Sequence, residues 1–338
     1  MSELNLSLNL NSMFENINKS NQYQLSHKII NDNKNGCIFH PNIPCHGEQE
    51  DIKYISKIQE FNKNEVEIGE VIKTIPDYYL YFAPIIHSCN LEIAKVDKNE
   101  INKCKLFSTK IENFKNNTIR YVGKKDIIEY LKTATSKFKI IHSHLLEALR
   151  ILSTKNIVHL DLKKSNIMYD ENFKIPIIID FGLSLNYPFN MENFSFDYHP
   201  EYQPWCIDII IITYVHEEID TQITENEVEE LLNDYCEQNL SNIFYFTRYQ
   251  KEYWVREHKN YFVKLLKESK TKEEFIQKIS DDNYKTWDNF SLCIIILSFL
   301  DNYKPNEPKY IKQLSEFILL VPDKRPTIEE CQQIFAKL

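Results

Sequence analysis

The spacing of hydrophobic positions changes near residue 123. Before it, apolar residues form short runs at 52–58, 78–87 and 118–122, separated by polar loops, and this pattern predicts β-strands. Between them, apolar residues at 65–75 recur at helical spacing, and Asn64 with Glu67 predicts a capping box where this helix begins. We therefore expect a strand-rich region over residues 21–122 with one main helix.

The pattern beyond Gly123 is mostly helical. Apolar spacing predicts helices over 126–134 and 138–153, then a short strand over 175–179 that ends at Asp180, and mostly helix from there to residue 338. Residues 1–20, rich in Asn and Ser, are expected to form a disordered leader. The predicted class is α+β, with a small strand-rich lobe before a larger helical lobe over 123–338.

Length and charge narrow the functional classes. A chain of 338 residues with 43% hydrophobic content can bury a sizeable core. A formal net charge of −9 argues against general nucleic-acid binding, because that affinity comes from Lys and Arg neutralising phosphates. The longest apolar runs, 207–215 and 292–300, are about half as long as a bilayer crossing requires. We expect buried helices there, and no membrane or nucleic-acid partner.

Eight cysteines are scattered along the chain without a CxxC pair, and no secretory leader is recognised. This usage favours reduced thiols and a cytoplasmic setting. The grouping that invites a zinc interpretation is Cys37, His40, Cys45 and His46. Its irregular intervals and two prolines favour an ordinary β-hairpin instead.

The residues 159–166 contain the pattern His-x-Asp-x-Lys-x-x-Asn, and Asp180-Phe181-Gly182 follows fourteen residues after Asn166. Phosphoryl transfer depends mainly on positioning and charge stabilisation. Asp161 could orient an acceptor hydroxyl, and Lys163 could offset charge on the migrating phosphate. Asn166 and Asp180 supply the hard oxygen ligands that Mg²⁺ prefers. The spacing therefore predicts catalytic Asp161 and Lys163 with metal-binding Asn166 and Asp180.

These motifs resemble the catalytic loop and metal-binding triplet of eukaryotic-type serine/threonine protein kinases, and the likeness covers about residues 25–338. Lys163 argues against small-molecule kinases such as the aminoglycoside and choline kinases. The resemblance implies a bilobal kinase fold with an ATP cleft between the lobes. It further implies ATP and Mg²⁺ as cofactors and transfer to Ser/Thr hydroxyls of a protein substrate. The alternative is a pseudokinase, a nucleotide-binding or scaffolding module that keeps the fold.

The glycine-poor sequence and a long insertion look like those of kinases from large DNA viruses. In that case the compartment would be the host cytoplasm or the virion. The insertion, at about 205–285, could pack on the large lobe or form a docking surface, and we favour packing.

The predicted nucleotide-binding residues of the small lobe follow from the resemblance. Lys57 would bind the α- and β-phosphates, paired with Glu67 or, as an alternative, Glu70. The glycine-rich loop keeps one glycine, and asparagines stand where the first two glycines would be, since Asn tolerates left-handed backbone best among the other residues. The loop residues implied are Asn31, Asn33, Gly36 and Ile38. An ordinary polar turn is the alternative.

The segment 119–123 resembles the kinase hinge. By position, Tyr121 and Val122 would hold the adenine through their backbone, Ile119 would be the gatekeeper and Asp126 would bind the ribose hydroxyls.

Three further landmarks are structural. His199-Pro200-Glu201 resembles the end of the activation segment, with Arg325 as the predicted partner of Glu201. Asp288 resembles the central-helix aspartate that holds the catalytic loop, and Asp208 is its rival.

Leu160 stands where many of the protein kinases that this chain resembles carry an arginine, which often binds the phosphate on a phosphorylated activation loop. We therefore expect activity that does not require phosphate on Ser184, Ser195 or Tyr198.

Overall fold

The computed structural model describes residues 27–33, 36–91, 98–108, 114–189, 198–202, 205–241, 243, 247–303 and 306–338. The predicted leader and Ser195 lie outside these residues. The chain forms two compact units. The small unit comprises Met1–Glu60 and Cys89–Asn116, and the large unit comprises Phe61–Ser88 and Asn117–Leu338. These units do not coincide with the predicted lobes, whose boundaries stay a prediction.

The small unit is built on antiparallel strands. They are β1 (Lys28–Asn33), β2 (Gly36–His40) and β3 (Tyr54–Glu60), with Ile38 opposite Lys57. The strand order is β1-β2-β3-β6-β5, and both β5 (Ile85–Asn90) and β6 (Phe114–Arg120) continue from one unit into the other. A short helix, α3 (Lys98–Ile101), contributes Glu100, which accepts a hydrogen bond from the Ile29 N–H at 3.1 Å.

Two disulfides cross-link the small unit. Cys37 on β2 is bonded to Cys104, and Cys45 is bonded to Cys89 at the end of β5. The prediction of reduced thiols is therefore wrong for these four cysteines, because the fold brings together sulfurs that are 67 and 44 residues apart in sequence. The same bonds occupy the two sulfurs of the zinc grouping. Cys206, Cys236, Cys293 and Cys331 are free and buried.

The main predicted helix is present as α2 (Lys63–Lys73) in the large unit. Its N-cap is Asn62, whose side chain accepts a hydrogen bond from the Glu65 N–H at 3.0 Å. The predicted Asn64–Glu67 capping box is wrong, since the Asn64 amide donates to the Ser184 carbonyl at 2.5 Å. The run at 78–87 begins with a helical turn, Tyr78–Leu80, and then forms β4 (Phe82–Ala83) and the start of β5.

Short strands frame the sequence motifs. After α4 (Ile127–Thr133) and α5 (Phe138–Thr154), strand β7 (Ile157–Val158) pairs with β10 (Leu185–Asn186). Strand β8 (Ile167–Asp170) pairs with β9 (Ile175–Ile179). Residues 159–166 thus connect β7 to β8, and the triplet 180–182 connects β9 to β10.

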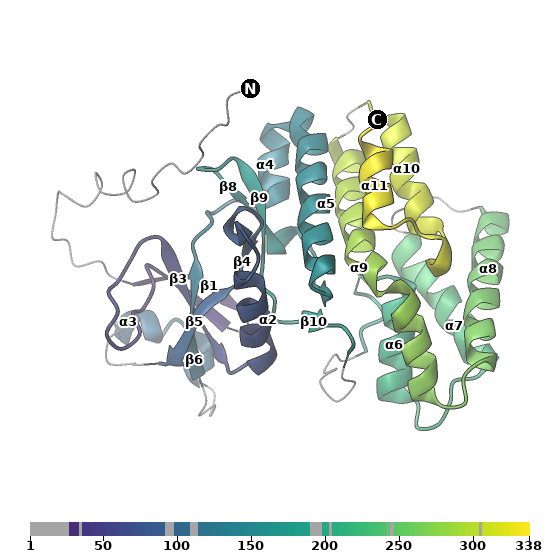
Figure 1. Ribbon diagram of the computed structural model, residues 1–338, viewed down its shortest axis with the longest axis horizontal. Coiled ribbons are helices and arrows are strands. Elements are labelled where there is room, and N and C mark those ends of the chain that lie inside the picture. The colour runs from purple at the N-terminus through teal and green to yellow at the C-terminus, as the bar shows by residue number, and fades with distance from the viewer. Residues whose placement is uncertain are drawn as a thin grey trace. The chain divides into compact units, whose positions relative to one another are not determined.

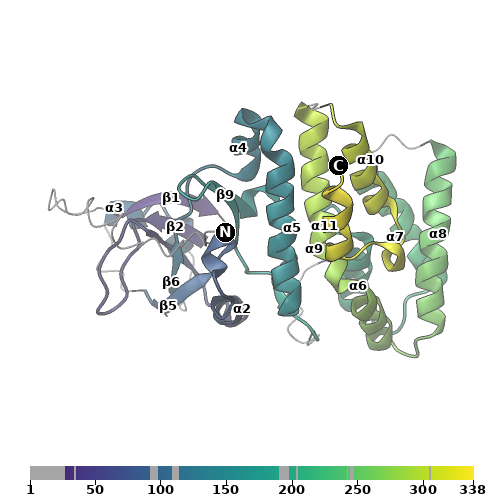
Figure 2. The same cartoon turned by 45° about the horizontal axis from the view of Figure 1, so that its top comes forward.

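Helices form the rest of the large unit. They are α6 (Ile207–Glu218), α7 (Glu225–Tyr235), α8 (Arg248–Lys267), α9 (Lys272–Tyr303), α10 (Pro308–Leu319) and α11 (Ile328–Phe335). Both views place α8 at the edge of this helical region (Figures 1 and 2). Trp254, Phe262 and Leu265 of α8 are buried in the main hydrophobic core, which agrees with packing of the predicted insertion.

The predicted apolar runs 207–215 and 292–300 lie in α6 and α9, where most of their side chains are buried. Among the described helices, none combines the length and apolar character of a membrane span. Strands and helices together confirm the predicted α+β class.

Candidate active site

A buried aspartate fixes the backbone of the predicted catalytic loop, residues 159–166. Asp288, in the middle of α9, accepts hydrogen bonds from the N–H groups of His159 at 2.7 Å and Leu160 at 2.9 Å. Leu160 has a positive φ of 61°, a conformation costly for a branched side chain, and its side chain is buried. The two hydrogen bonds offset that cost. Asp288 therefore has the role predicted for the central-helix aspartate, and its rival Asp208 does not.

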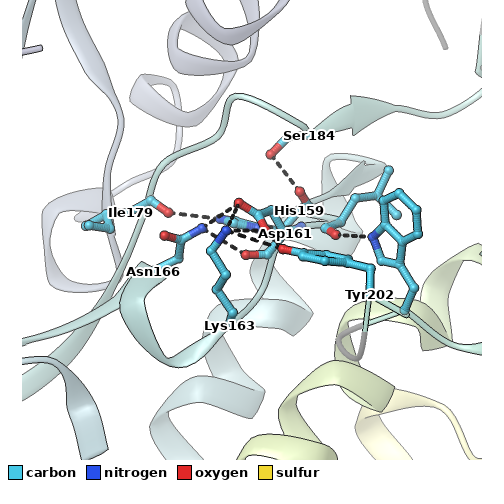
Figure 3. A network of polar contacts seen from close by, with 9 residues as sticks. His159, Asp161, Lys163, Asn166, Ile179, Ser184 and Tyr202 are labelled. Carbon is cyan, nitrogen blue, oxygen red and sulfur yellow. Dashed lines mark hydrogen bonds and ion pairs between the residues drawn. The ribbon is translucent and has the colours of Figure 1, made fainter. Parts of the chain in front are cut away.

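Asp161 is the centre of a network of polar contacts (Figure 3). Its Oδ2 accepts from the Asn166 side-chain amide at 2.8 Å, and the same amide nitrogen donates to the Asp161 carbonyl at 2.9 Å. The Lys163 amine lies 2.9 Å from Oδ1 and 3.0 Å from Oδ2. Asp161 retains 6% exposure and Lys163 has a 39% exposed side chain, so the carboxylate is held firmly while the amine stays reachable.

His159 connects the catalytic loop to the end of β9. Its Nε2 lies 3.0 Å from the Ile179 carbonyl oxygen, which can only accept, so Nε2 carries the proton. Nδ1 then accepts from the Asp161 N–H at 3.2 Å. The ring also packs against Phe181, with 5.0 Å between centroids. A neutral His159 thus fixes the backbone of Asp161 relative to the triplet that begins at Asp180.

The predicted metal ligands have suitable donor chemistry. Because the Asn166 amide nitrogen is committed to Asp161, its amide oxygen is the atom left to face a cation. Asp180 has a φ of 63° at the end of β9 and contributes a carboxylate. A neutral and a charged oxygen donor fit a hard divalent cation such as Mg²⁺. Asn166 and Asp180 would hold it, and the bound ion would neutralise phosphate charge.

The helix carboxylate beside the triplet is Glu65. Glu67 lies on the exposed face of α2 and pairs with Lys63 at 3.4 Å, while Glu70 pairs with Lys73 at 2.7 Å. Glu65 retains 2% exposure, and its Oε2 is 3.7 Å from the point where a Cβ on Gly182 would stand. The prediction that Glu67, or alternatively Glu70, faces the site is therefore wrong.

A second contact joins α2 to the triplet. The Asn62 amide donates to the Gly182 carbonyl at 2.9 Å. Asn62 is also the N-cap of α2, so the first turn of this helix and the triplet are positioned together.

Arg325 pairs with Asp208 rather than with Glu201. The Arg325 Nη1 lies 2.7 Å from Asp208 Oδ2, and the two side chains are 1% and 0% exposed. The prediction of a Glu201–Arg325 pair is wrong, because the buried carboxylate near Arg325 comes from the first turn of α6. This pair anchors the first turn of α6.

Tyr202 is the site residue that sequence patterns missed. Its hydroxyl donates a hydrogen bond to Asp161 Oδ1, and the Lys163 amine lies 3.3 Å from the same hydroxyl (Figure 3). Nearby, the Trp205 indole donates to the Leu160 carbonyl at 2.7 Å. Burial, and then the charge of Asp161, raise the pKa of Tyr202 well above its usual range. A tyrosine one residue after His-Pro-Glu was the available signal, but it matched no motif.

The small unit places the predicted loop residues on two paired strands. Asn31 is opposite Ile38, and Asn33 is opposite Gly36. A Cβ on Gly36 would stand 2.9 Å from the Ile58 carbonyl oxygen, so any other residue at this position would force its neighbours to shift. Lys57 lies on the neighbouring strand β3. Nucleotide binding by Asn31, Asn33, Gly36, Ile38 and Lys57 stays a prediction.

The predicted hinge begins within the last two residues of β6 and continues beyond the strand. Ile119 and Val122 are buried, whereas Asp126 is the N-cap of α4 and accepts from the Glu129 N–H at 2.8 Å. Gly123 has a φ of +143°, which disfavours other residues there. The adenine contacts of Tyr121 and Val122 and the ribose contact of Asp126 stay predictions.

The chain was compared with known proteins. Residues 100–207, which include the whole catalytic loop and the triplet, match the family model of the protein kinase domain. No curated protein matches the chain. The solved structure of the kinase PK-1 from Cydia pomonella granulovirus is similar, with 20% identity and a TM-score of 0.37, over 63% of this chain and 70% of that chain. A TM-score this low supports no inference. The stretch that carries the candidate site, residues 100–207, is therefore similar to the protein kinase domain.

Proposed function

We propose that this protein is a kinase that transfers the γ-phosphoryl group of ATP to serine and threonine hydroxyls of a protein substrate. The observation that carries the proposal is the network in which Asn166 and Lys163 hold both carboxylate oxygens of Asp161. A carboxylate fixed in this way can accept a hydrogen bond from an acceptor hydroxyl and orient it for in-line attack.

The charges around Asp161 suit phosphate chemistry. Lys163 is exposed enough for its amine to contact a migrating phosphate, and a fixed cation stabilises charge without reorganisation during the reaction. Asn166 and Asp180 would hold Mg²⁺, and Lys57 of the small unit would bind the α- and β-phosphates. Lys163 two residues after Asp161 supports serine/threonine rather than tyrosine specificity, by the resemblance set out above. Glu65 replaces Glu67 as the proposed helix carboxylate.

The proposed setting is the cytoplasm, or the virion if the gene is viral. Two disulfides in the small unit would then require an oxidising thiol pathway in that compartment.

Transfer from ATP labelled on its γ-phosphate tests the proposal. With Mg²⁺ and a generic protein substrate, we expect label on serine or threonine by phosphoamino-acid analysis. Asp161→Asn should lower the transfer rate by about 100- to 10,000-fold, because the carboxylate that orients the hydroxyl is lost. Nucleotide affinity should stay nearly unchanged. Asp180→Asn should weaken binding of the Mg²⁺–nucleotide complex as well.

Asp323→Asn is the matched control, since Asp323 is an exposed aspartate in a helical turn of the large unit. It should transfer phosphate like the parent protein. If the parent protein and the Asp323→Asn control both bind nucleotide but transfer no phosphate, the result would favour the pseudokinase alternative. Full transfer rates in Asp161→Asn would show that the roles assigned here are wrong.

A further inference from the structure

The Tyr202 hydroxyl lies where an acceptor hydroxyl would have to bind. It donates to Asp161 Oδ1, and it lies 3.3 Å from the Lys163 amine. An acceptor serine would need the same two partners: Asp161 to orient its hydroxyl, and Lys163 at the phosphate beside it. The other oxygen, Oδ2, is already bonded to Asn166 and Lys163. Tyr202 therefore uses the hydrogen-bonding position on Asp161 that an acceptor needs.

Neighbouring side chains support Tyr202 through its backbone segment. The Asn239 amide donates to the Pro200 carbonyl at 2.8 Å, and the Tyr235 hydroxyl donates to the Trp205 carbonyl at 3.0 Å. Tyr235 ends α7, and Asn239 lies in the π-helical turn that follows it. Both belong to the predicted insertion. Pro200 and Trp205, one on each side of Tyr202 in the sequence, thus each accept a hydrogen bond from the insertion.

Two other contacts fix the same segment to the catalytic loop and the core. Trp205 donates to the Leu160 carbonyl, next to Asp161, and packs edge to face on the Tyr202 ring with 5.0 Å between centroids. Asp208, six residues beyond Tyr202, forms the buried pair with Arg325. Because these contacts are mostly buried, the position of Tyr202 is built into the large unit.

We propose that Tyr202 is an internal competitor for the acceptor site, held against Asp161 by α7 and the π-helical turn. This proposal rests on the proposed function. A protein substrate has to displace the Tyr202 side chain before its own hydroxyl reaches Asp161. The raised pKa of Tyr202 is consistent with this role, because a hydroxyl that stays protonated remains a donor to the carboxylate. The insertion would then restrain the acceptor site of the kinase.

Steady-state transfer by Tyr202→Phe is the first test. Loss of a hydrogen bond to a charged group should lower KM for a protein substrate by roughly tenfold, with kcat little changed. Tyr198→Phe is the matched control, because Tyr198 precedes it in the same segment and packs on Tyr214. A fall in kcat at unchanged KM would overturn the proposal, since Tyr202 would then position Asp161 for catalysis. Phosphate found on Tyr202 itself would also overturn it.

A second variant tests the restraint by the insertion. Tyr235→Phe removes the hydroxyl that supports Trp205, so KM should fall in the same direction as in Tyr202→Phe, but less. An unchanged KM in a folded Tyr235→Phe protein would show that the insertion does not hold Tyr202 against Asp161.

A spectroscopic measurement separates this proposal from the proposed function. With tyrosine labelled at the ring carbon that bears the hydroxyl, the Tyr202 signal can be identified by its loss in Tyr202→Phe. We expect Asp161→Asn to shift that signal, whether or not the protein transfers phosphate. An unshifted signal would show that the Tyr202–Asp161 contact is absent in solution and would overturn the proposal even in an active kinase.

Discussion

The small and large units are stabilised by different means. In the small unit, a hydrophobic cluster of six buried residues among those described is reinforced by two disulfides. In the large unit, the catalytic loop is held by buried polar groups set in an extensive apolar core, with Asp288 and the Arg325–Asp208 pair as examples.

This difference follows from the amount of apolar surface each unit can bury. A small cluster contributes little hydrophobic stabilisation, so covalent bonds that restrict the unfolded chain have a large relative effect. A large core can bury charged and polar groups, provided that each meets a partner. The two units should therefore respond differently to reduction, to acid and to loss of a buried charge.

The largest expected effect is loss of the buried cation in the large unit. Arg325→Met leaves Asp208 buried without its partner, and breaking a buried pair costs about 3 to 5 kcal/mol of unfolding free energy. Denaturant unfolding measures the loss. The double variant Arg325→Met with Asp208→Leu should recover much of it, because both charges are then removed. A double variant no more stable than the single one would contradict the account.

Reduction of the two disulfides should destabilise the small unit. Opening the 67-residue loop closed by Cys37–Cys104 should cost about 4 kcal/mol, mainly by freeing the unfolded chain. Native-state hydrogen exchange should show lower protection in β2 and β3 after reduction, with the core of the large unit unchanged as the internal control. The denatured, unreduced protein should titrate as four free thiols, the number of free cysteines. All eight titrating before reduction would rule out the disulfides.

Acid should destabilise the large unit through His142. The ring is fully buried, and burial lowers its pKa from 6.5 to about 3, while its Nδ1 is bonded to the Tyr310 hydroxyl at 2.6 Å. Because the folded-state pKa is below the unfolded value, this stability is complete above pH 6.5 and is lost as the pH falls from about 6.5 toward 3. At pH 5 the loss should be about 2 kcal/mol.

Unfolding free energies between pH 7 and pH 5 measure this dependence. His142→Phe removes the titrating group, so its stability should change less over that range, and His144→Phe, which alters a neighbouring histidine on α5, is the comparison variant. An equally steep pH dependence in His142→Phe would assign the effect to other groups.

The smallest expected effects come from replacing one glycine by alanine in each unit. A Cβ on Gly36 or on Gly69 would stand 2.9 Å from a backbone carbonyl oxygen, of Ile58 and Ile85 respectively. Gly36→Ala should cost about 1 to 2 kcal/mol through this clash. Gly69→Ala should cost less, since alanine in the interior of α2 recovers about 0.5 to 1 kcal/mol. Urea unfolding followed in each unit checks the order, and a larger cost for Gly69→Ala would reverse it.

Several parts of the fold were predictable from local patterns. The strand at 175–179 has the predicted bounds, and the helix predicted over 138–153 extends one residue further, because periodicity in these segments matches the buried faces. The choice of Asp288 over Asp208 was also correct. Phe-Ser-Leu after Asp288 marked the buried helix, and the aspartate contacts the loop from within α9.

Other predictions failed where one residue depends on a distant one. The sequence pattern favours Glu67, with Glu70 as the alternative, yet the helix turns Glu65 inward and Glu67 toward solvent. The carboxylate for Arg325 comes from α6 rather than from Glu201. In both cases the residue types were right, but local spacing does not specify which of several similar carboxylates is buried.

The sequence by itself determined the candidate site as a group, with Asp161 and Lys163 as predicted catalytic residues and Asn166 and Asp180 as predicted metal ligands, because their order and spacing lie within one short stretch of chain. Only the tertiary structure decided the disulfide pairs, the Arg325–Asp208 pair and the placement of Tyr202 on Asp161. These contacts join residues about 40 to 120 positions apart in the sequence. Long-range contacts arise from the packing of whole elements, and no local pattern of residue types records which partners that packing brings together.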